Sequence, residues 1–150
     1  MTGNAGLAVL AQRLRHVAEN LPTERRIALE EIGEHGADTA RNLLGTYQPE
    51  TGPFPAWPEL ADSTKAERVR LGFTENDPLR RSGELAESIS YRVDGTRSVA
   101  VGSPMDEMVY SELGTVTEPP RPALGPALIR SGGYIVERLS AAVTRAFRGA

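Results

Sequence analysis

Apolar residues near the start of the chain recur at steps of three and four residues, the spacing that places side chains on one stripe of a helix. The residues with this spacing are Leu7, Leu10, Leu14 and Val17. The pattern predicts a short first helix over residues 5–18. Pro22 lacks the amide donor that a continuing helix needs, although proline suits the first turn of a new one. We therefore predict that a second, amphipathic helix begins near Pro22 and ends at Gly45.

The segment 46–58 carries four prolines, so it cannot hold regular structure for long. We predict a long proline-rich loop there. Its aromatic side chains are Tyr47, Phe54 and Trp57, which are costly to leave in water. Two interpretations stay open for these aromatic residues: they hold the loop to the protein's own core, or they form an interface with a neighbouring subunit.

Two short helices are expected in the middle of the chain. The first covers residues 63–71, with Ser63 or Thr64 as its cap, and ends at Gly72. The second is a single helical turn that opens at Ser82. The residues between them form a loop.

Between residues 89 and 113 apolar residues alternate with polar ones, which is typical of half-buried strands. The clearest apolar members of this pattern are Ile89, Tyr91, Val93, Val99 and Val101. Asp94-Gly95 between two of the runs is a strong signal for a hairpin turn, and residues 109–113 are a candidate for a third strand. We predict an α+β fold, in which an antiparallel sheet of about three to four strands is packed by N-terminal and C-terminal amphipathic helices.

A helical pattern returns over residues 127–148, and the pair Gly132-Gly133 is expected to bend or split it. The apolar stripe of this pattern consists of Leu128, Ile135, Leu139, Ala142 and Ala146. The far side of the predicted helix carries Arg130, Arg138, Arg145 and Arg148. Cations spaced along a helix match the phosphates of DNA, but they also suit an acidic partner protein or an ordinary solvated face. All three interpretations stay open.

Composition narrows the class of protein. A chain of 150 residues is typical of one globular domain, which we expect to span residues 1–150. The formal net charge of −3 gives the molecule no general attraction for nucleic acid or membranes. The lack of cysteine excludes disulfides, thiolate metal sites and cysteine nucleophiles. The sequence shows neither a membrane span nor a signal peptide, so we expect a soluble protein of the cytoplasm.

Few residues have the pattern of a catalytic site. Glu31, His35 and Asp38 share a predicted helical face and in principle suit a divalent metal, although a solvated polar face is the favoured interpretation. A second acidic group consists of Asp106, Glu107 and Glu112. These residues suit either a nuclease site or protection of a sheet edge. No serine lies in a nucleophile elbow, and no Gly-rich loop precedes a lysine. We expect no enzymatic activity, no cofactor and no metal.

Four short motifs follow one another in the second half of the chain. Residues 82–89 read SGELAESI, residues 101–103 read VGS, residues 110–115 read YSELGT and residues 121–128 read RPALGPAL. In this order they resemble the motifs of the gene-product-ten family of lambdoid tailed phages, which comprises head-tail connector and tail-completion proteins. Residues 57–64 are also similar to the opening of the virion-morphogenesis proteins of transposable phages. Each motif alone is weak, whereas four in order are more specific.

The resemblance marks a set of candidate assembly and scaffold residues. They are Ser82, Gly83, Leu85, Ser88, Ile89, Gly102, Tyr110, Glu112, Gly114, Thr115, Arg121, Pro122 and Pro126. Two features depart from the family pattern. Ala123 stands where an aromatic residue is usual, and the spacing from Tyr110 to Glu112 is compressed.

The resemblance implies a structural protein of the virion neck. Such a subunit is expected to assemble with itself into a ring, of six copies as the resemblance implies, with DNA passing through the lumen without sequence specificity. Its expected neighbours are connector, tail-terminator or tail-tube proteins, and its expected location is the virion after assembly in the host cytoplasm. The alternative function is sequence-independent DNA binding through the arginines of the last helix.

Overall fold

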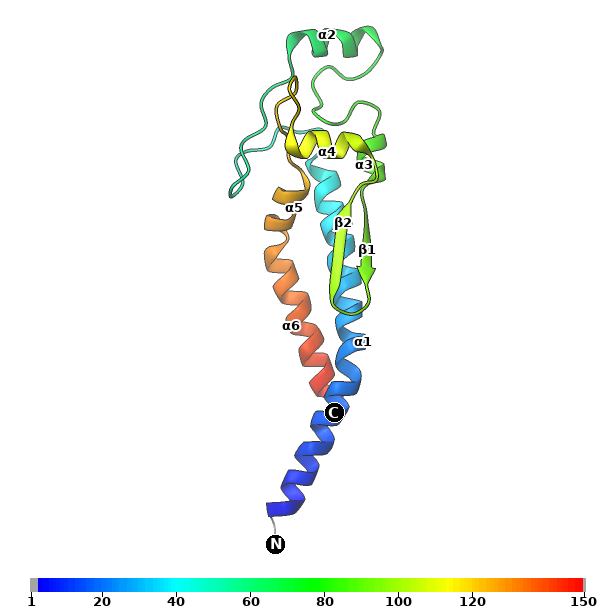
Figure 1. Cartoon of the computed structure of the whole chain (residues 1–150), viewed down its shortest axis with the longest axis vertical. Helices are drawn as coiled ribbons and strands as arrows, with labels where there is room; N and C mark the ends of the chain where they lie inside the picture. The colour runs from blue at the N-terminus through cyan, green and yellow to red at the C-terminus, as the bar shows by residue number, and fades with distance from the viewer. Residues whose placement is uncertain (1–2, 150) are drawn as a thin grey trace. The chain divides into compact units, whose positions relative to one another are not determined.

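A computed structural model describes residues 3–149 of the chain, and within that range the fold mixes helices with one small sheet (Figure 1). The helices are α1 (Gly3–Leu43), α2 (Asp62–Arg70), α3 (Glu84–Ser88), α4 (Asp106–Leu113), α5 (Leu124–Arg130) and α6 (Gly132–Arg148). The strands are β1 (Ser90–Asp94) and β2 (Ser98–Gly102). The predicted mixture of helix and antiparallel sheet is therefore confirmed.

The fold divides into two compact units. The first contains the chain up to Gly33, the hairpin segment Arg92–Ala100 and the chain from Gly133 onward. The second contains Glu34–Tyr91 and Val101–Gly132. Helix α1 and the β1–β2 hairpin each contribute to both units, and each unit is described by itself below.

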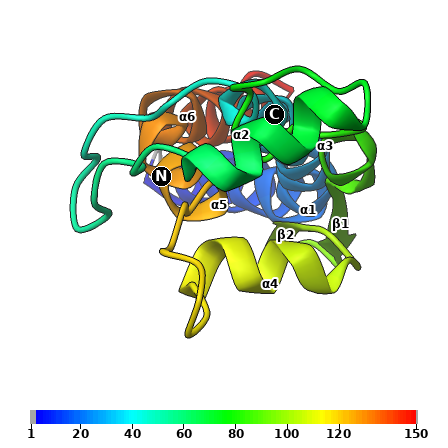
Figure 2. The same ribbon diagram turned by 90° about the horizontal axis from the view of Figure 1, so that it is seen from above.

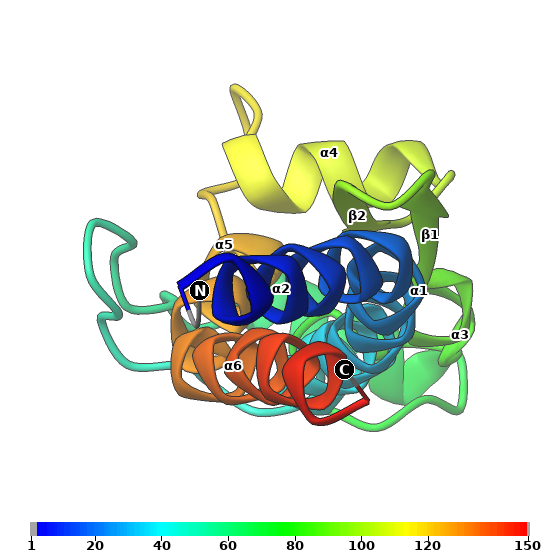
Figure 3. The ribbon, with the colours of Figure 1, turned by 90° about the horizontal axis from the view of Figure 1, so that it is seen from below.

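In the first unit, α6 lies beside α1, whose first turns extend past the end of α6 (Figure 1, Figure 3). Arg145 of α6 donates to Glu24 of α1 over 2.5 Å, and Arg25 donates to Thr96 in the hairpin turn over 3.0 Å. The buried apolar residues of this unit are Val17, Ala28, Leu29, Ile32, Ala142 and Ala146. Half of them are alanines, so the helices pack closely but bury little apolar area.

Helix α1 corrects the expectation of two N-terminal helices, because it continues from Gly3 to Leu43 with Pro22 inside it. Proline removes one backbone hydrogen bond and costs roughly 3 kcal/mol in a helix interior. Val17 before it and Ala28 after it are both buried in the first unit. Packing on both sides of Pro22 therefore stabilises the continuous helix. The predicted end of this helix near Gly45 is confirmed, since α1 ends at Leu43 and Gly45 has a φ of 95°.

The second unit contains the larger core. Its buried members come from α1, the proline-rich loop, α3, α4 and α5: Ala37, Ala40, Leu43, Leu44, Trp57, Ala86, Ile89, Met108, Ala123 and Ala127. Partly buried side chains that pack against this core include Tyr47 and Leu85. The core thus joins segments from both ends of the unit's sequence.

The sheet has two strands within the described residues, not three to four. The predicted hairpin at Asp94-Gly95 is confirmed, with Gly95 at a φ of 58°. Residues 109–113, predicted as a strand, lie instead in helix α4. Val109 and Leu113 are spaced for a helix as well as for a strand. Asp106 and Glu107 fall in the first turn, where acidic side chains favour a helix.

The remaining helices follow the sequence pattern with two corrections. Helix α2 begins after Ala61 with no side-chain cap, so the predicted Ser63 or Thr64 cap is wrong. The split of the last helix is confirmed, since α5 ends at Arg130 and α6 begins at Gly132. The predicted apolar stripe is only partly buried, because Leu128 is 65% exposed and Leu139 is 37% exposed. None of the described helices has the length and apolar character needed to cross a membrane.

Candidate functional site

The sequence motifs contact one another inside the second unit, and the strongest link joins the proline-rich loop to the segment before α5. Trp57 is 5% exposed, and its Nε1 donates to the carbonyl oxygen of Pro122 over 2.9 Å. Arg121 is also buried; its Nε and Nη2 donate to the carbonyl oxygens of Pro58 and Glu59, both over 3.0 Å. These three bonds satisfy backbone acceptors that a proline-rich segment cannot pair in regular structure.

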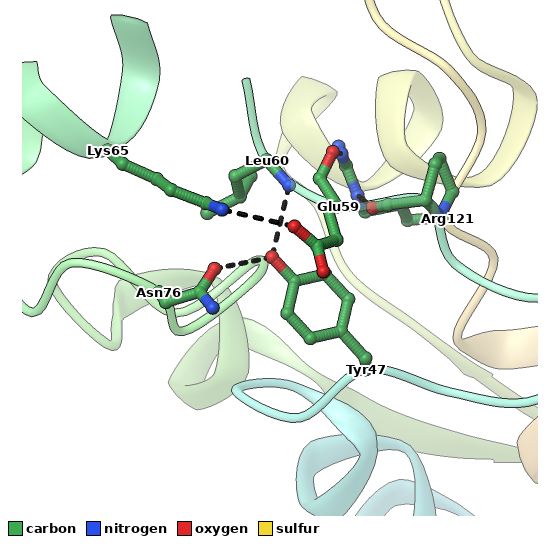
Figure 4. A network of polar contacts seen from close by, with 7 residues as sticks. Tyr47, Glu59, Leu60, Lys65, Asn76 and Arg121 are labelled. Atoms are coloured by element: carbon green, nitrogen blue, oxygen red, sulfur yellow. Dashed lines mark hydrogen bonds and ion pairs between the residues drawn. The ribbon is translucent and has the colours of Figure 1, made fainter. Parts of the chain in front are cut away.

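The same loop makes a second polar cluster, shown in Figure 4. The hydroxyl of Tyr47 donates to Asn76 over 2.5 Å and accepts from the backbone amide of Leu60 over 3.0 Å. Lys65 donates to Glu59 over 3.2 Å. This hydrogen bond raises the pKa of Lys65. The network fastens the end of the proline-rich loop to the start of α2 and to the loop that follows α2.

Phe54 occupies the tip of the loop, where it pairs with Thr51 through two backbone hydrogen bonds of 3.0 and 3.1 Å. Its ring covers Gly125 in α5 so closely that a Cβ built on the glycine would lie 2.1 Å from Cζ. Tyr47, Phe54 and Trp57 therefore all contact the second unit's own residues. In this structure the loop is held to its own core, which is one of the two interpretations of its aromatic residues.

Glu112 connects α4 to the start of α5. Its Oε1 accepts hydrogen bonds from the backbone amides of Ala123 and Leu124, both over 2.6 Å. The amide of Arg121 also donates to the carbonyl oxygen of Ser111 over 2.7 Å. A carboxylate at this place satisfies the unpaired first amides of a helix and suits the positive end of its dipole. Glu112 thus acts as a cap supplied from elsewhere in the chain.

The other motif residues shape turns and packing. Ser88 and Ser103 lie 2.6 Å apart through their Oγ atoms, which joins the end of α3 to the segment after β2. Gly83 has a φ of 93° directly before α3. The remaining motif positions range from buried to exposed: Ile89, Pro122 and Pro126 are buried, Leu85, Gly102 and Gly114 are half-buried, and Ser82, Tyr110 and Thr115 are exposed.

Gly114 has the tightest surroundings of the glycines among the candidate scaffold residues. It has a φ of 75°, and a Cβ there would lie 3.0 Å from the ring of Pro120. Thr115 follows it, and its Oγ1 accepts from the amide of Glu118 over 3.0 Å. The motif thus builds a tight loop between α4 and α5.

Of the four arginines predicted on the outer side of the last helix, Arg130, Arg145 and Arg148 are exposed and Arg138 is half-buried. In the first unit Arg145 pairs with Glu24, and Arg138 lies 3.7 Å from Glu31 and also bonds Glu137. The hydrogen bond with Glu137 raises the pKa of Arg138. In the second unit Arg130 donates to Gln48 over 3.0 Å, while Arg148 is exposed. Two of the four arginines therefore pair with acidic residues of α1 within the first unit.

The two acidic groups weighed as metal sites are dispersed. Glu31 pairs with Arg138, and Asp38 pairs with Arg41 over 2.5 Å. Glu112 is engaged with the start of α5. Across residues 3–149, no three His, Asp or Glu side chains are grouped closely enough to hold a metal ion.

Sequence reasoning missed a pocket of about 420 Å³ in the second unit, between α3 and α4. Its lining mixes charges of both signs, including Arg68 and Glu84, with the ring of Tyr110. Arg68 is 6% exposed and donates to the carbonyl oxygen of Asp77 over 2.6 Å; burial lowers its pKa. Leu79 in the wall has a φ of 59°, which is strained for a residue other than glycine. The mixed charge favours no one ligand class.

Comparison with protein-family models, with curated proteins and with solved structures finds no match for this chain.

Proposed function

We propose that the chain is a structural subunit of the neck of a tailed phage, which completes or joins the tail by forming a ring around the DNA channel. The observation that supports this most is the use made of the motif residues. The side chains of Trp57, Arg121 and Glu112 form hydrogen bonds with backbone groups of other motif segments. Residues used in this way define a scaffold, as the resemblance to neck proteins implies.

A structural role also fits the surface of the second unit. Several large apolar side chains are exposed on α4, on the loop that follows it and on α5, among them Leu113 at 76% and Leu128 at 65%. Large exposed apolar patches are typical of surfaces that bind another protein, a membrane or a ligand, and the proposal takes the first of these. The proposed partners are further copies of the chain, with six as the proposed number, and neighbouring connector, tail-terminator or tail-tube proteins.

DNA binding through the arginines is the weaker proposal. Arg138 and Arg145 are paired with acidic side chains, and such pairs reduce the number of counterions that these cations can release on binding DNA. Under the neck proposal, DNA contacts the ring only as it passes through the lumen, without sequence specificity.

Native mass spectrometry combined with electron microscopy of the purified full chain tests the ring directly. We expect a closed oligomer, with six copies as the expected number, that shows a central hole in top views. A protein that stays monomeric in isolation and on mixing with purified phage tails and heads would contradict the proposal.

A further inference from the structure

Helix α4 presents an apolar face that no described residue covers. Val109, Tyr110 and Leu113 are 51%, 50% and 76% exposed, and their spacing places them on one side of the helix. The buried side carries Met108 instead. Val116 in the following loop is fully exposed. Figure 2 and Figure 3 show α4 and this loop at the outer edge of the second unit.

Acidic residues predominate around this face: Arg68 and Arg81 line the pocket beside Tyr110, but Arg68 is buried and Arg81 pairs with Glu67. Residues 98–120 contain four acidic residues and no lysine or arginine. Glu112 is engaged by the start of α5, whereas Asp106, Glu107 and Glu118 are exposed. An apolar row with a negative border is therefore available for a partner that is apolar and basic. We call Val109, Tyr110, Leu113 and Val116 the α4 face.

The first turns of α1 carry a second exposed apolar row. Leu7, Leu10 and Leu14 are 65%, 52% and 53% exposed, although they continue the same stripe that is buried at Val17. Their helical spacing puts all three on one side, which we call the N-terminal row.

Charge around the N-terminal row is basic. Arg13 and Arg15 are exposed and lie on either side of the row. The first acidic residue of the chain is Glu19. The row is therefore apolar with a positive border.

We propose that the N-terminal row of one copy docks on the α4 face of a second copy. This inference rests on the proposed function, since it names the contact that would connect subunits of the ring. Each surface is a helix with apolar residues at steps of three and four, the pattern by which one helix packs against another. Arg13 and Arg15 then face the acidic border of Asp106, Glu107 and Glu118.

Charge favours this pairing over the symmetric ones. Contact between two α4 faces would bring two acidic borders together. Contact between two N-terminal rows would bring Arg13 and Arg15 of one copy close to the same arginines of the other. Like charges across an interface disfavour such pairings. Because the favoured contact joins two different surfaces, it is head-to-tail, and repeated contacts of this type close into a ring when the rotation permits.

Engineered thiols test the contact without a background, because the chain contains no cysteine. Leu10→Cys and Leu113→Cys are made in two copies with different tags, mixed, and oxidised mildly. Both positions are more than half exposed, so the variants should fold. We expect the mixed disulfide to form several-fold more than the disulfide between two copies of the Leu10→Cys variant or between two copies of the Leu113→Cys variant. The matched control is Val9→Cys, which has the same 52% exposure as Leu10 but points about 100° away around α1.

A mixed disulfide no more abundant than with Val9→Cys overturns the inference. A chain that carries both cysteines tests whether the α4 face binds the N-terminal row of another copy or of its own chain. Disulfides between copies support the proposal, and a disulfide closed within one chain overturns it. A ring seen by mass spectrometry without the mixed disulfide also overturns this contact but leaves the proposed function intact. A mixed disulfide in a protein absent from phage necks would support the contact and reject the function.

Charge reversal provides a second test. Arg13→Glu with Arg15→Glu should lower the yield of the mixed disulfide roughly three- to tenfold, as expected for two exposed ion pairs. Asp106→Lys with Glu107→Lys in the other copy should restore it. No loss on the first reversal, or no recovery on the second, contradicts the proposed pairing.

Discussion

Trp57 donates a hydrogen bond from its indole nitrogen to the carbonyl oxygen of Pro122, 65 positions away in the sequence, over 2.9 Å. Because both residues are buried, Trp57→Phe would leave this carbonyl without its partner and open a small space beside it. We expect the variant to lose about 1–3 kcal/mol of unfolding free energy, measured by urea denaturation.

Tyr91→Phe is the control for this substitution. Tyr91 is exposed on β1, so removal of its hydroxyl should change stability by less than about 0.5 kcal/mol. Equal effects of the two variants would show that the bond between Trp57 and Pro122 contributes nothing specific.

Because Phe54 contacts Gly125, replacement of Gly125 by alanine should lower the stability of the protein, whereas the same replacement at Gly133 should raise it. Gly125→Ala forces the Phe54 ring to move, and we expect a loss of about 1–3 kcal/mol. Gly133 lies in α6 with no atom near its Cβ position. Gly133→Ala should therefore stabilise the protein by up to about 1 kcal/mol. Thermal and urea denaturation of both variants measure these differences.

A double variant separates the ring contact from other effects at Gly125. In a Phe54→Ala background the added methyl group meets no ring, so Gly125→Ala should no longer destabilise the protein. A loss of the same size in both backgrounds would mean that Phe54 is not the cause.

The cap that Glu112 provides for α5 predicts a graded loss. Glu112→Ala removes the acceptor of two backbone amides and should cost about 0.5–2 kcal/mol. Glu112→Gln keeps an acceptor oxygen and should cost less. Glu75→Ala, at an exposed acidic residue, should have little effect. Equal losses for the alanine and glutamine variants would argue against a capping role.

The pairing of Arg145 with Glu24 distinguishes a packing role from DNA binding. Arg145→Glu should destabilise the first unit by about 0.2–1 kcal/mol, and adding Glu24→Arg should recover most of the loss. Titration of duplex DNA with Arg138→Glu, Arg145→Glu should show the same weak binding as the original chain. A large, salt-dependent loss of duplex affinity would favour the DNA-binding proposal instead.

The sequence correctly predicted the elements that depend on interactions between residues close together in the chain. The hairpin at Asp94-Gly95 and the split of the last helix before Gly132 follow from turn chemistry and from the helical cost of glycine. The end of α1 near Gly45 follows from the conformation that glycine allows.

Other features depend on contacts that a single sequence does not display. Val109 and Leu113 fit a strand and a helix equally, and α4 is decided by burial of Met108 and by the link from Glu112 to α5. Pro22 predicted a break between two helices, but α1 continues through it because the helix is packed on both sides of the proline. The motif residues were identified from the sequence, but their role as hydrogen-bond partners of distant backbone groups required the fold.

The most direct test of the proposed function is electron microscopy of lysates from a phage whose copy of this gene has been deleted, with the gene supplied in trans as the control. The proposal predicts full heads lying beside separate tails, and joined virions when the gene is restored. Intact, joined virions in the absence of the gene would contradict a role in the neck.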